Sequence, residues 1–396
     1  MNRDRIPVVS VPAPLKPKTG KPALDESSKS GLIPVAPIGL TERSVFHEPW
    51  WLNATAGDDW HTAVVKAGDE VIGEMPYTLT KKGLWRVSYL PPLTRTLGPV
   101  IKRQPADSGD PEWIHRVDVT RKLIAQLPEC AHFLQIAHPL VSEAEATAFS
   151  LHGYKVSVGF TLKMPVGADE ETVWRGLRWN TRNRVRRSSE RFSVQEITSV
   201  ETFADFYDSN LATRELDNVY GSTIMRRLLH EVLRNNAGMI LGSFDSDGTL
   251  NAATALVWDK SNVYYFLTTR QATAHSGAVA LLIWQAMKVA RDRKLELDFD
   301  GVSTAGILQF LAGFGGQLVR RYTFEQTRSD VALVRTVRAS SRDLAKRVRG
   351  MVAKKSAPEE EKPAENEKPA GKEKSAGKDK PAEKEKPAEK EKSTEK

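Results

Sequence analysis

The sequence has almost no cysteine and no long apolar run. Cys130 is the single cysteine in 396 residues, so the chain alone forms no disulfide and a reducing compartment is expected. No stretch reaches the roughly 18–20 apolar residues that a membrane helix needs. No apolar run follows the first basic residues, as it would in a secretory signal. We therefore expect a soluble, cytoplasmic protein, which leaves open peripheral contact with a membrane surface.

Motifs for metals and nucleotides are missing as well. The eight histidines and the single cysteine show no zinc-ligand spacing, so no metal is expected. There is no P-loop, no dinucleotide-binding fingerprint and no G-x-S-x-G. Substrate positioning and electrostatics remain as the expected means of any catalysis.

Positive charge is present but unevenly spread. The net charge is +8, and the excess lies in residues 174–191, with seven Arg and one Glu, and in residues 335–355, with eight Lys or Arg and one Asp. Such concentration favours a polyanionic partner: a phosphate-bearing ligand, tRNA or an anionic membrane. Apolar residues at partly helical spacing make 335–355 a predicted basic helical segment.

The two ends of the chain lack the apolar residues of a core. Residues 1–40 contain seven prolines and predict a disordered arm. Residues 356–396 repeat Lys, Glu, Pro and Ala, with eleven Lys against twelve Asp or Glu, and predict a disordered tail. Its near-balanced charge argues against a dedicated nucleic-acid arm.

Between the ends, one order of elements occurs twice: helix, hairpin, strand, helix, strand, helix, strand. The first copy occupies residues 41–160 and the second residues 161–334. Hairpin turns are expected at Gly68-Asp69 and Asp247-Gly248. One continuous helix is expected over 169–190 and another over 277–293. The order predicts an α/β fold with mixed sheets in two tandem domains.

Five stretches carry a resemblance to a known family: "PWWLNATAG", "PPLTRTLGP", "WRGLRWNTRNRVRRSSE", "ALLIWQAMKVARDRKLELDFDGV" and "FLAGFGGQLVRRY". In their order, over residues 44–327, they resemble a tandem pair of GNAT acyltransferase folds, as in FemAB-like or CelD-like proteins related to the Fem aminoacyltransferases. The resemblance implies an acyltransferase, with the donor site in the second domain. The Pro-rich loop 91–99 is then either a lid or a fixed wall of the cleft.

The resemblance also implies where an acyl-CoA donor binds. GNAT domains hold the donor pyrophosphate on backbone N–H groups at the start of a helix, here the one over 277–293. Ala274 and Val279 depart from the usual Gln/Arg-x-x-Gly-x-Gly/Ala motif, and Ser276 also suits a plain N-cap. The candidate donor-binding residues are Arg270, His275, Ser276, Gly277 and Ala278.

Arginines of the basic stretch recur at helical spacing. In one helix, Arg178, Arg182 and Arg186 would share a face with Arg175 and could bind phosphate groups. The plain alternative is a solvated basic helix that pairs with nearby acids.

Catalytic candidates come from the strand "LELDFDG" and from tyrosines. Alternation would place Asp298 and Asp300 on one face with Glu296, and Asp300 could be a general base or a helix cap. The family often uses a Tyr as general acid, which makes Tyr264, Tyr265 and Tyr322 candidates. Tyr264 and Tyr265 would lie on opposite faces of their strand, so at most one of them faces a cleft.

The leading hypothesis is acetyl-CoA-dependent acyl transfer to an amine or hydroxyl of a sugar or other cell-envelope precursor. A second is aminoacyl-tRNA-dependent transfer. Leu311 opposes it, because it stands where Fem-type enzymes often carry a Lys. A third is a non-catalytic protein that binds nucleic acid or an anionic membrane.

Overall fold

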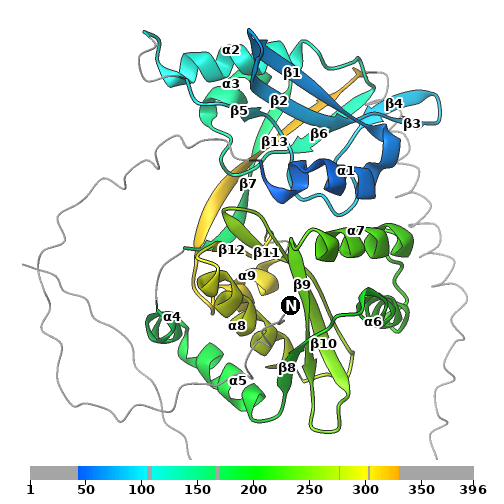
Figure 1. The fold of residues 1–396 in the computed structure, drawn as a ribbon, viewed down its shortest axis with the longest axis vertical. Helices are drawn as coiled ribbons and strands as arrows, with labels where there is room; N and C mark the ends of the chain where they lie inside the picture. The colour runs from blue at the N-terminus through cyan, green and yellow to red at the C-terminus, as the bar shows by residue number, and fades with distance from the viewer. Residues whose placement is uncertain (1–42, 105–108, 166–168, 276, 302–303, 330–396) are drawn as a thin grey trace, which may run out of the picture. The chain divides into compact units, whose positions relative to one another are not determined.

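A long mixed sheet joins the two halves of the chain (Figure 1). The computed structural model describes residues 43–104, 109–165, 169–275, 277–301 and 304–329, so the predicted arm 1–40, segment 335–355 and tail 356–396 lie outside the described residues. Within these ranges, ten strands form this sheet in the spatial order β3 (Thr80–Lys82), β4 (Trp85–Ser88), β6 (His132–Ile136), β13 (Gln317–Thr327), β7 (Lys155–Met164), β12 (Glu296–Asp298), β11 (Asn262–Arg270), β10 (Leu250–Trp258), β9 (Gly238–Phe244) and β8 (Ser193–Glu196).

The predicted mixed α/β class is confirmed. The pairs β11–β12 and β4–β6 are parallel, whereas β12–β7, β10–β11 and β13–β7 are antiparallel. The α-helices of the described residues are α1 (Pro49–Ala56), α2 (Glu112–Ile124), α3 (Glu143–Leu151), α4 (Glu170–Gly176), α5 (Trp179–Ser189), α6 (Val200–Ala212), α7 (Ser222–Arg234), α8 (Gly277–Asp292) and α9 (Ala305–Leu311). No helix in these ranges is long and apolar enough to span a bilayer.

A second, three-stranded sheet lies in the first half. It consists of β1 (Trp60–Ala67), β2 (Glu70–Thr78) and β5 (Val100–Ile101). The predicted β1–β2 hairpin is confirmed, and Gly68 takes the left-handed conformation (φ +63°) that its turn requires. Helix α2 packs on β1 and β2, and α3 packs on α2. Phe133, Phe149 and Phe324 lie in the core beneath them.

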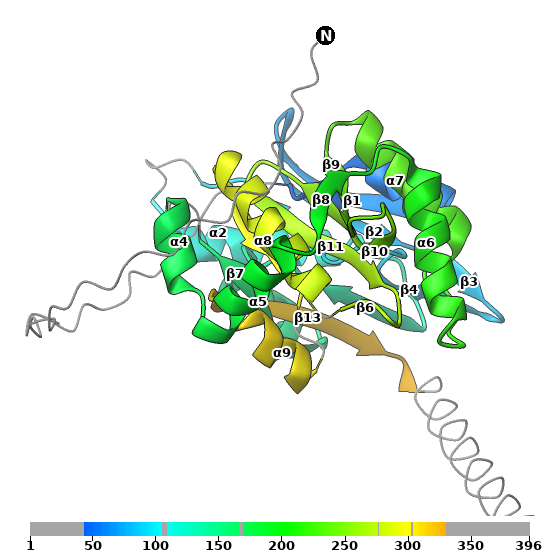
Figure 2. The same ribbon diagram turned by 90° about the horizontal axis from the view of Figure 1, so that it is seen from below.

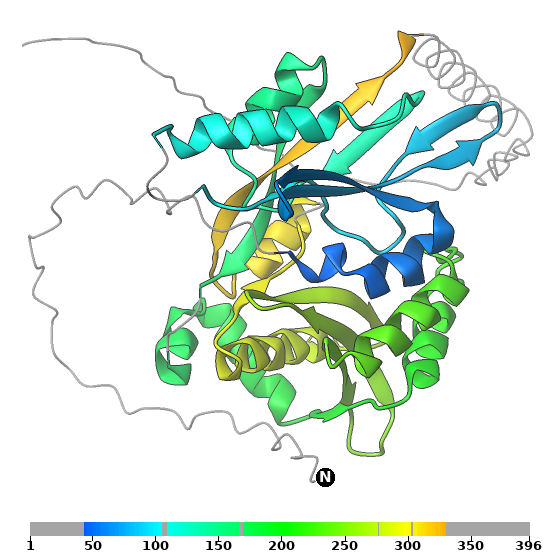
Figure 3. The ribbon, with the colours of Figure 1, turned by 45° about the horizontal axis from the view of Figure 1, so that its top comes forward.

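The last described strand belongs to both halves. β13 pairs with β6 on one side and with β7 on the other, so a strand from the end of the second half lies inside the sheet of the first (Figure 3). Its register with β7 runs from Gln317–Lys163 to Glu325–Lys155. Because the pairing is long, the two halves are joined by a continuous backbone hydrogen-bond ladder.

In the second half, β8 to β12 are covered on both faces (Figure 2). Helix α8 packs against β9 to β12 on one face, where almost all of its side chains are buried, and α5 packs on α8. Helices α6 and α7 lie over the other face. There, the first-half residues Phe46 and Trp51 share a core with Phe203 and Leu228, so α1 packs on α7 although the two are far apart in sequence.

The helix predicted over 169–190 is broken. Helix α4 ends at Gly176 and α5 begins at Trp179, with Leu177 and Arg178 extended between them (ψ 144° and 146°). The N–H of Arg178 donates to the carbonyl of Gly313 at 2.9 Å. The predicted single face of Arg175, Arg178, Arg182 and Arg186 is therefore wrong, because the helical register is lost at this link.

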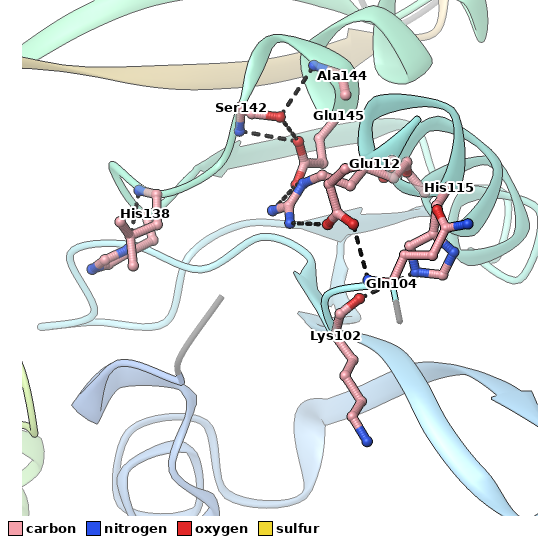
Figure 4. Close-up of polar contacts among 11 residues, drawn as sticks. Lys102, Gln104, Glu112, His115, His138, Ser142, Ala144 and Glu145 are labelled. Carbon is pink, nitrogen blue, oxygen red and sulfur yellow. Dashed lines mark hydrogen bonds and ion pairs between the residues drawn. The ribbon is translucent and has the colours of Figure 1, made fainter. Parts of the chain in front are cut away.

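A buried ion-pair network fixes α2 against α3 (Figure 4). Arg116 and Glu145 are both fully buried, and Arg116 Nε donates to Glu145 Oε1 at 2.9 Å. The second oxygen of Glu145 accepts from the N–H and hydroxyl groups of Ser142, the N-cap residue of α3. Glu112 adds a second carboxylate, 3.3 Å from Arg116 Nη1. The arginine charge is thus compensated by two carboxylates, those of Glu145 and Glu112.

We expect Glu145→Ala to lower the free energy of unfolding by roughly 3–5 kcal/mol, because it leaves the Arg116 charge buried with only Glu112 as partner. Urea denaturation measures the change. The matched control is Glu171→Ala, which breaks the exposed Glu171–Arg175 pair and should cost less than about 1 kcal/mol. Equal losses in the two variants would contradict the argument.

Candidate active site

The ladder between β11 and β12 is short. It contains the pairs Asn262–Glu296, Val263–Leu297 and Tyr264–Asp298. Beyond Tyr264, β11 continues to Arg270 while it pairs with β10 on its other side. A cavity of about 680 Å³ lies along β11 past the point where β12 ends.

The cavity reaches both faces of the sheet. Val279 and Ile283 of α8 line it from one face, and Tyr207 of α6 and Tyr220, just before α7, line it from the other. Residues of β11 and α9 complete the wall; those used below are Tyr265, Phe266, Arg270, Phe310 and Leu311. A ligand along β11 would therefore contact a group on each side of the sheet, which is the arrangement that a two-substrate reaction needs.

The first half of the chain contributes Arg95 to this cavity. Its Nη2 donates to the carbonyl of Phe266 at 2.8 Å, its Nη1 to the hydroxyl of Tyr220 at 3.2 Å, and its Nε pairs with the carboxylate of Asp300. The guanidinium also lies over the rings of Tyr220 and Phe266, 5.5 and 5.0 Å from their centroids. Arg95 thus links the loop 91–99 to the second half.

That loop is a fixed wall rather than a lid. Leu93 (φ +64°), Thr94 and Leu97 are buried. Trp51 Nε1 donates to the hydroxyl of Thr94 at 3.0 Å, and the N–H of Leu97 donates to the carbonyl of Ile136 at 2.8 Å. A loop with these buried anchors cannot open without breaking them.

Asp300 lies at the inner end of the cavity in a left-handed conformation (φ +58°) with 8% of its side chain exposed. Burial raises its pKa to about 7. The positive charges of Arg95 and Arg321 oppose this rise, and the neighbouring Asp298 adds to it. A carboxylate with a pKa near neutrality can accept a proton at physiological pH.

Of the three acids of "LELDFDG", Asp300 lines the cavity, whereas Glu296 and Asp298 do not. β12 ends at Asp298, and the turn at Asp300 carries the Asp300 side chain into the cavity. Asp298 instead accepts from the hydroxyl of Thr161 and from the N–H of Asp300, and Glu296 pairs with Lys163 at 2.8 Å. Asp300 is not a helix cap either, because the N-cap of α9 is Thr304.

The start of α8 is organised by His275. Its Nδ1 accepts from the N–H of Gly277 at 3.1 Å, and its carbonyl accepts from the N–H of Ala278 at 3.0 Å. The side chain of Ala278 points into the core with no exposure. Ser276 lies outside the described residues. A phosphate bound here would have to displace the imidazole of His275 from the Gly277 N–H.

Gly277 is explained by packing. A Cβ at this position would lie 1.8 Å from Oγ of Ser188 in α5 and 2.9 Å from Nδ1 of His275. The glycine therefore allows α5 and α8 to approach closely, whether or not a phosphate binds beside it.

Two arginines lie at the outer end of the cavity. Arg270 Nη1 donates to the carbonyl of Ala274 at 3.2 Å, and Arg214 Nη2 donates to the carbonyl of Arg270 at 2.7 Å. Among the described residues, neither guanidinium forms an ion pair. Both keep donors for an anionic ligand.

The other predicted phosphate-binding arginines do not line the cavity. Arg182 Nη1 donates to the carbonyls of Arg175 and Leu177 and so caps the C-terminus of α4. Arg178 is the N-cap residue of α5, and Arg186 lies further along that helix. Arg184 is nearer to the cavity, because its guanidinium lies 5.6 Å from the ring centroid of the lining residue Phe310.

Two of the three predicted tyrosines, Tyr264 and Tyr322, do not line the cavity. Tyr264 is buried in the core on the α6–α7 face, and its hydroxyl donates to Asp259 at 2.9 Å. Tyr322 is buried in the first half, near Glu143 and Phe324. The strand neighbour Tyr265 lines the cavity instead, and burial raises its pKa to about 12, so it is protonated at neutral pH.

Sequence reasoning did not identify Arg95, Tyr207, Arg214 or Tyr220. One signal existed for Arg95: it is the single charged residue in "PPLTRTLGP", where its neighbours are apolar or small. Tyr207 belongs to α6, and Arg214 and Tyr220 belong to the α6–α7 connection; none of these segments has a recognisable motif. Only the packing of α6 and α7 on β11 brings them to the cavity.

The described ranges offer little as a competing site. A second cavity of about 530 Å³ is lined by Trp50, Trp258, Asp259 and others near the start of the described chain. The carboxylate of Asp259 already accepts hydrogen bonds from the hydroxyl of Tyr264 and from backbone N–H groups of its own turn. No group of three or more His, Cys, Asp or Glu within the described residues could hold a metal ion.

Comparison with known proteins identifies a domain family in the second half of the chain. Residues 176–305 match the acetyltransferase (GNAT) domain family. The fold is similar to the crystal structure of FemX, with 12% identity, a TM-score of 0.56, and coverage of 72% of this chain and 92% of that chain. No curated protein sequence gives a match.

Two other solved structures are similar at lower TM-scores. One is a tandem GNAT protein from the clavulanic acid biosynthesis pathway, with 12% identity, a TM-score of 0.42, and coverage of 70% of this chain and 86% of that chain. The other is the C-terminal domain of a putative lysylphosphatidylglycerol synthetase from Agrobacterium fabrum, with 14% identity, a TM-score of 0.46, and coverage of 75% and 92%.

We expect Gly277→Ala to destabilise the protein, because the new methyl group overlaps Oγ of Ser188. In a Ser188→Ala background the same substitution should cost less, so a double-mutant cycle measured by urea denaturation should give a coupling of about 0.5–3 kcal/mol. Additive effects would mean that the two helices adjust without contact at this point.

Proposed function

We propose that this member of the FemAB-like group of GNAT-fold proteins transfers an acyl group from acetyl-CoA to an amine or hydroxyl acceptor. The observation that carries the proposal is the separation of β11 from β12, which leaves a cavity reaching both faces of the sheet with Asp300 at its inner end. An acyl donor and an acceptor can meet there without a covalent enzyme intermediate.

The donor would enter from the α8 side. Its phosphates would lie near Arg270 and the start of α8, where the helix dipole is positive. Its acyl arm would run along β11, past Val279 and Ile283, toward Asp300. Binding at the start of α8 requires His275 to release the Gly277 N–H, so a bound donor should change the environment of this imidazole.

The acceptor would enter from the α6–α7 side. Asp300 would take the proton of the attacking amine or hydroxyl, and Tyr265 would protonate the departing thiolate. Tyr265 replaces Tyr264 and Tyr322 in this role, because it is the one of the three that lines the cavity. The free donors of Arg214 favour an acceptor with an anionic group, which a phosphorylated sugar or envelope precursor would supply.

Transfer from aminoacyl-tRNA is the second candidate. The observation in its favour is the row of exposed arginines on α5 and the α4–α5 link, Arg178, Arg184 and Arg187. Such a surface suits a phosphate backbone. Leu311, which lines the cavity, places an apolar side chain where a charged one would assist peptidyl transfer.

We expect Val279→Trp to abolish acetyl-CoA binding, because Val279 is partly exposed at the cavity wall and a larger ring would fill the donor path without entering the core. Calorimetric titration with acetyl-CoA measures it. Val71→Trp, at an exposed valine of β2, is the matched control and should bind as wild type does.

The same titrations with total tRNA at two salt concentrations separate the two donors. Saturable acetyl-CoA binding with weak tRNA binding supports the first candidate. Binding of tRNA that falls steeply with salt, with no binding of acetyl-CoA, would overturn it.

We expect Asp300→Asn to lower the turnover number by roughly 10²–10⁴-fold, because the amide cannot accept a proton. In the unsubstituted protein, the rate should rise with pH through about 7, where the Asp300 carboxyl loses its proton. Release of free thiol from acetyl-CoA across pH 5–9, in the presence of small amine and amino-sugar acceptors, provides the measurement. A pH profile that is unchanged in Asp300→Asn would remove Asp300 from the reaction.

A further inference from the structure

We propose that Arg95, supplied by the first half of the chain, is the positioning residue of the reaction cavity in the second half. It holds the Asp300 carboxylate at the inner end of the cavity and favours its ionised form. The proposal rests on the proposed function for its catalytic consequence, but the interaction itself can be tested without turnover.

The contacts of Arg95 distinguish it from a substrate-binding arginine. Each of its three side-chain nitrogens has a protein partner: the carbonyl of Phe266, the hydroxyl of Tyr220 and the carboxylate of Asp300. Arg214, by contrast, uses one nitrogen on a backbone carbonyl. With a protein partner at each of its three nitrogens, the Arg95 guanidinium is held in place and can in turn hold Asp300 and the backbone of β11.

The carbonyl that Arg95 contacts is available because of a β-bulge. Ala255 pairs with Leu267 and Leu256 pairs with Tyr265, so Phe266 is the extra residue of β11 at this point. A bulge residue is not held by the regular ladder. Arg95 therefore ties down the backbone of β11 immediately beyond the last β12 pair, where the two strands separate.

Asp300 also depends on Arg95 for its geometry. Its φ of +58° is unfavourable for a residue with a side chain and persists only where surrounding contacts determine it. The N–H of Asp300 is fixed by Asp298, and the N–H of Gly301 by the hydroxyl of Thr161. The Arg95 ion pair then fixes the carboxylate itself.

The charged and titratable groups that face Asp300 come from four segments of the chain. Arg95 lies in the loop 91–99, Arg321 of β13 has its Nη1 4.0 Å away, Asp298 ends β12, and Tyr264 lies on β11. The residues of α8 and α9 that line the cavity within the described ranges are apolar. Arg95 is the closer of the two cations, so it should contribute most to keeping the carboxylate ionised.

Loss of Arg95 should thus raise the pKa of Asp300. An opposite charge in contact lowers a carboxyl pKa by roughly 1–3 units, so Arg95→Gln should raise that of Asp300 by a similar amount. Asp300 would then be protonated at pH 7 and would not act as a base. Turnover should recover at higher pH, whereas a merely structural defect would lower it at every pH.

The test is a ¹³C NMR titration of the full-length protein labelled at the aspartate carboxyl carbons, with Asp300→Asn used to assign the resonance. We expect the Asp300 midpoint to move up in Arg95→Gln and to stay in place in Arg234→Gln, which removes one exposed arginine charge of α7 far from the cavity lining. An unchanged midpoint in Arg95→Gln overturns the proposal. This titration needs no turnover, so its result is separate from any failure of acyl transfer.

If Arg95→Gln does not fold, the kinetics of Arg95→Lys test the positioning role instead. A lysine keeps one charge beside Asp300 but cannot reach all three partners. We expect the acid limb of the pH profile to remain near that of wild type, the KM for acetyl-CoA to be unchanged and kcat to fall by at least about tenfold, because alignment is lost. A wild-type kcat in this variant overturns the positioning role.

Discussion

The cavity exists because β12 pairs with β11 over three residues and then ends. β11 continues, held on its other side by β10, and the edge that β12 leaves becomes one wall of a space of about 680 Å³. Each further feature of the site depends on this separation. The turn at Asp300 brings a carboxylate into the space, the bulge at Phe266 offers a carbonyl, and helices on both faces of the sheet reach the same opening.

Where the two strands separate, a buried carboxylate such as that of Asp300 needs a positive charge as partner. The first half supplies this charge through Arg95, whose loop is held by hydrogen bonds with Trp51 and Ile136. The second half in turn supplies β13, which lies between β6 and β7 in the sheet of the first half. Each half therefore completes the other, and the link that carries the chemistry is an ion pair between residues 205 positions apart, Arg95 and Asp300.

Charge in this protein divides into two kinds. Arg116 and Glu145 are buried and compensate each other, which fixes α2 against α3. Arg182 caps a helix end. Arg214 and Arg270 differ, because both rest on backbone carbonyls and keep donors at the cavity. The cavity is thus lined by Arg214 and Arg270, which lie outside the arginine-rich stretch 174–191, and not by arginines of that stretch.

From local patterns alone, the sequence predicted the mixed α/β class, the hairpin at Gly68, the long helix that begins at residue 277 and Asp300 as a catalytic candidate, because periodicity, turn residues and helix caps are local properties. It also named Arg270 as a donor-binding candidate, and Arg270 lines the cavity. The sequence could not show that Arg95 contacts Asp300 and Tyr220, which of the tyrosines lines the cavity, or that Gly277 allows a close contact with Ser188. These features depend on where β12 ends and on which surfaces pack together in three dimensions, and the local spacing of residues contains neither.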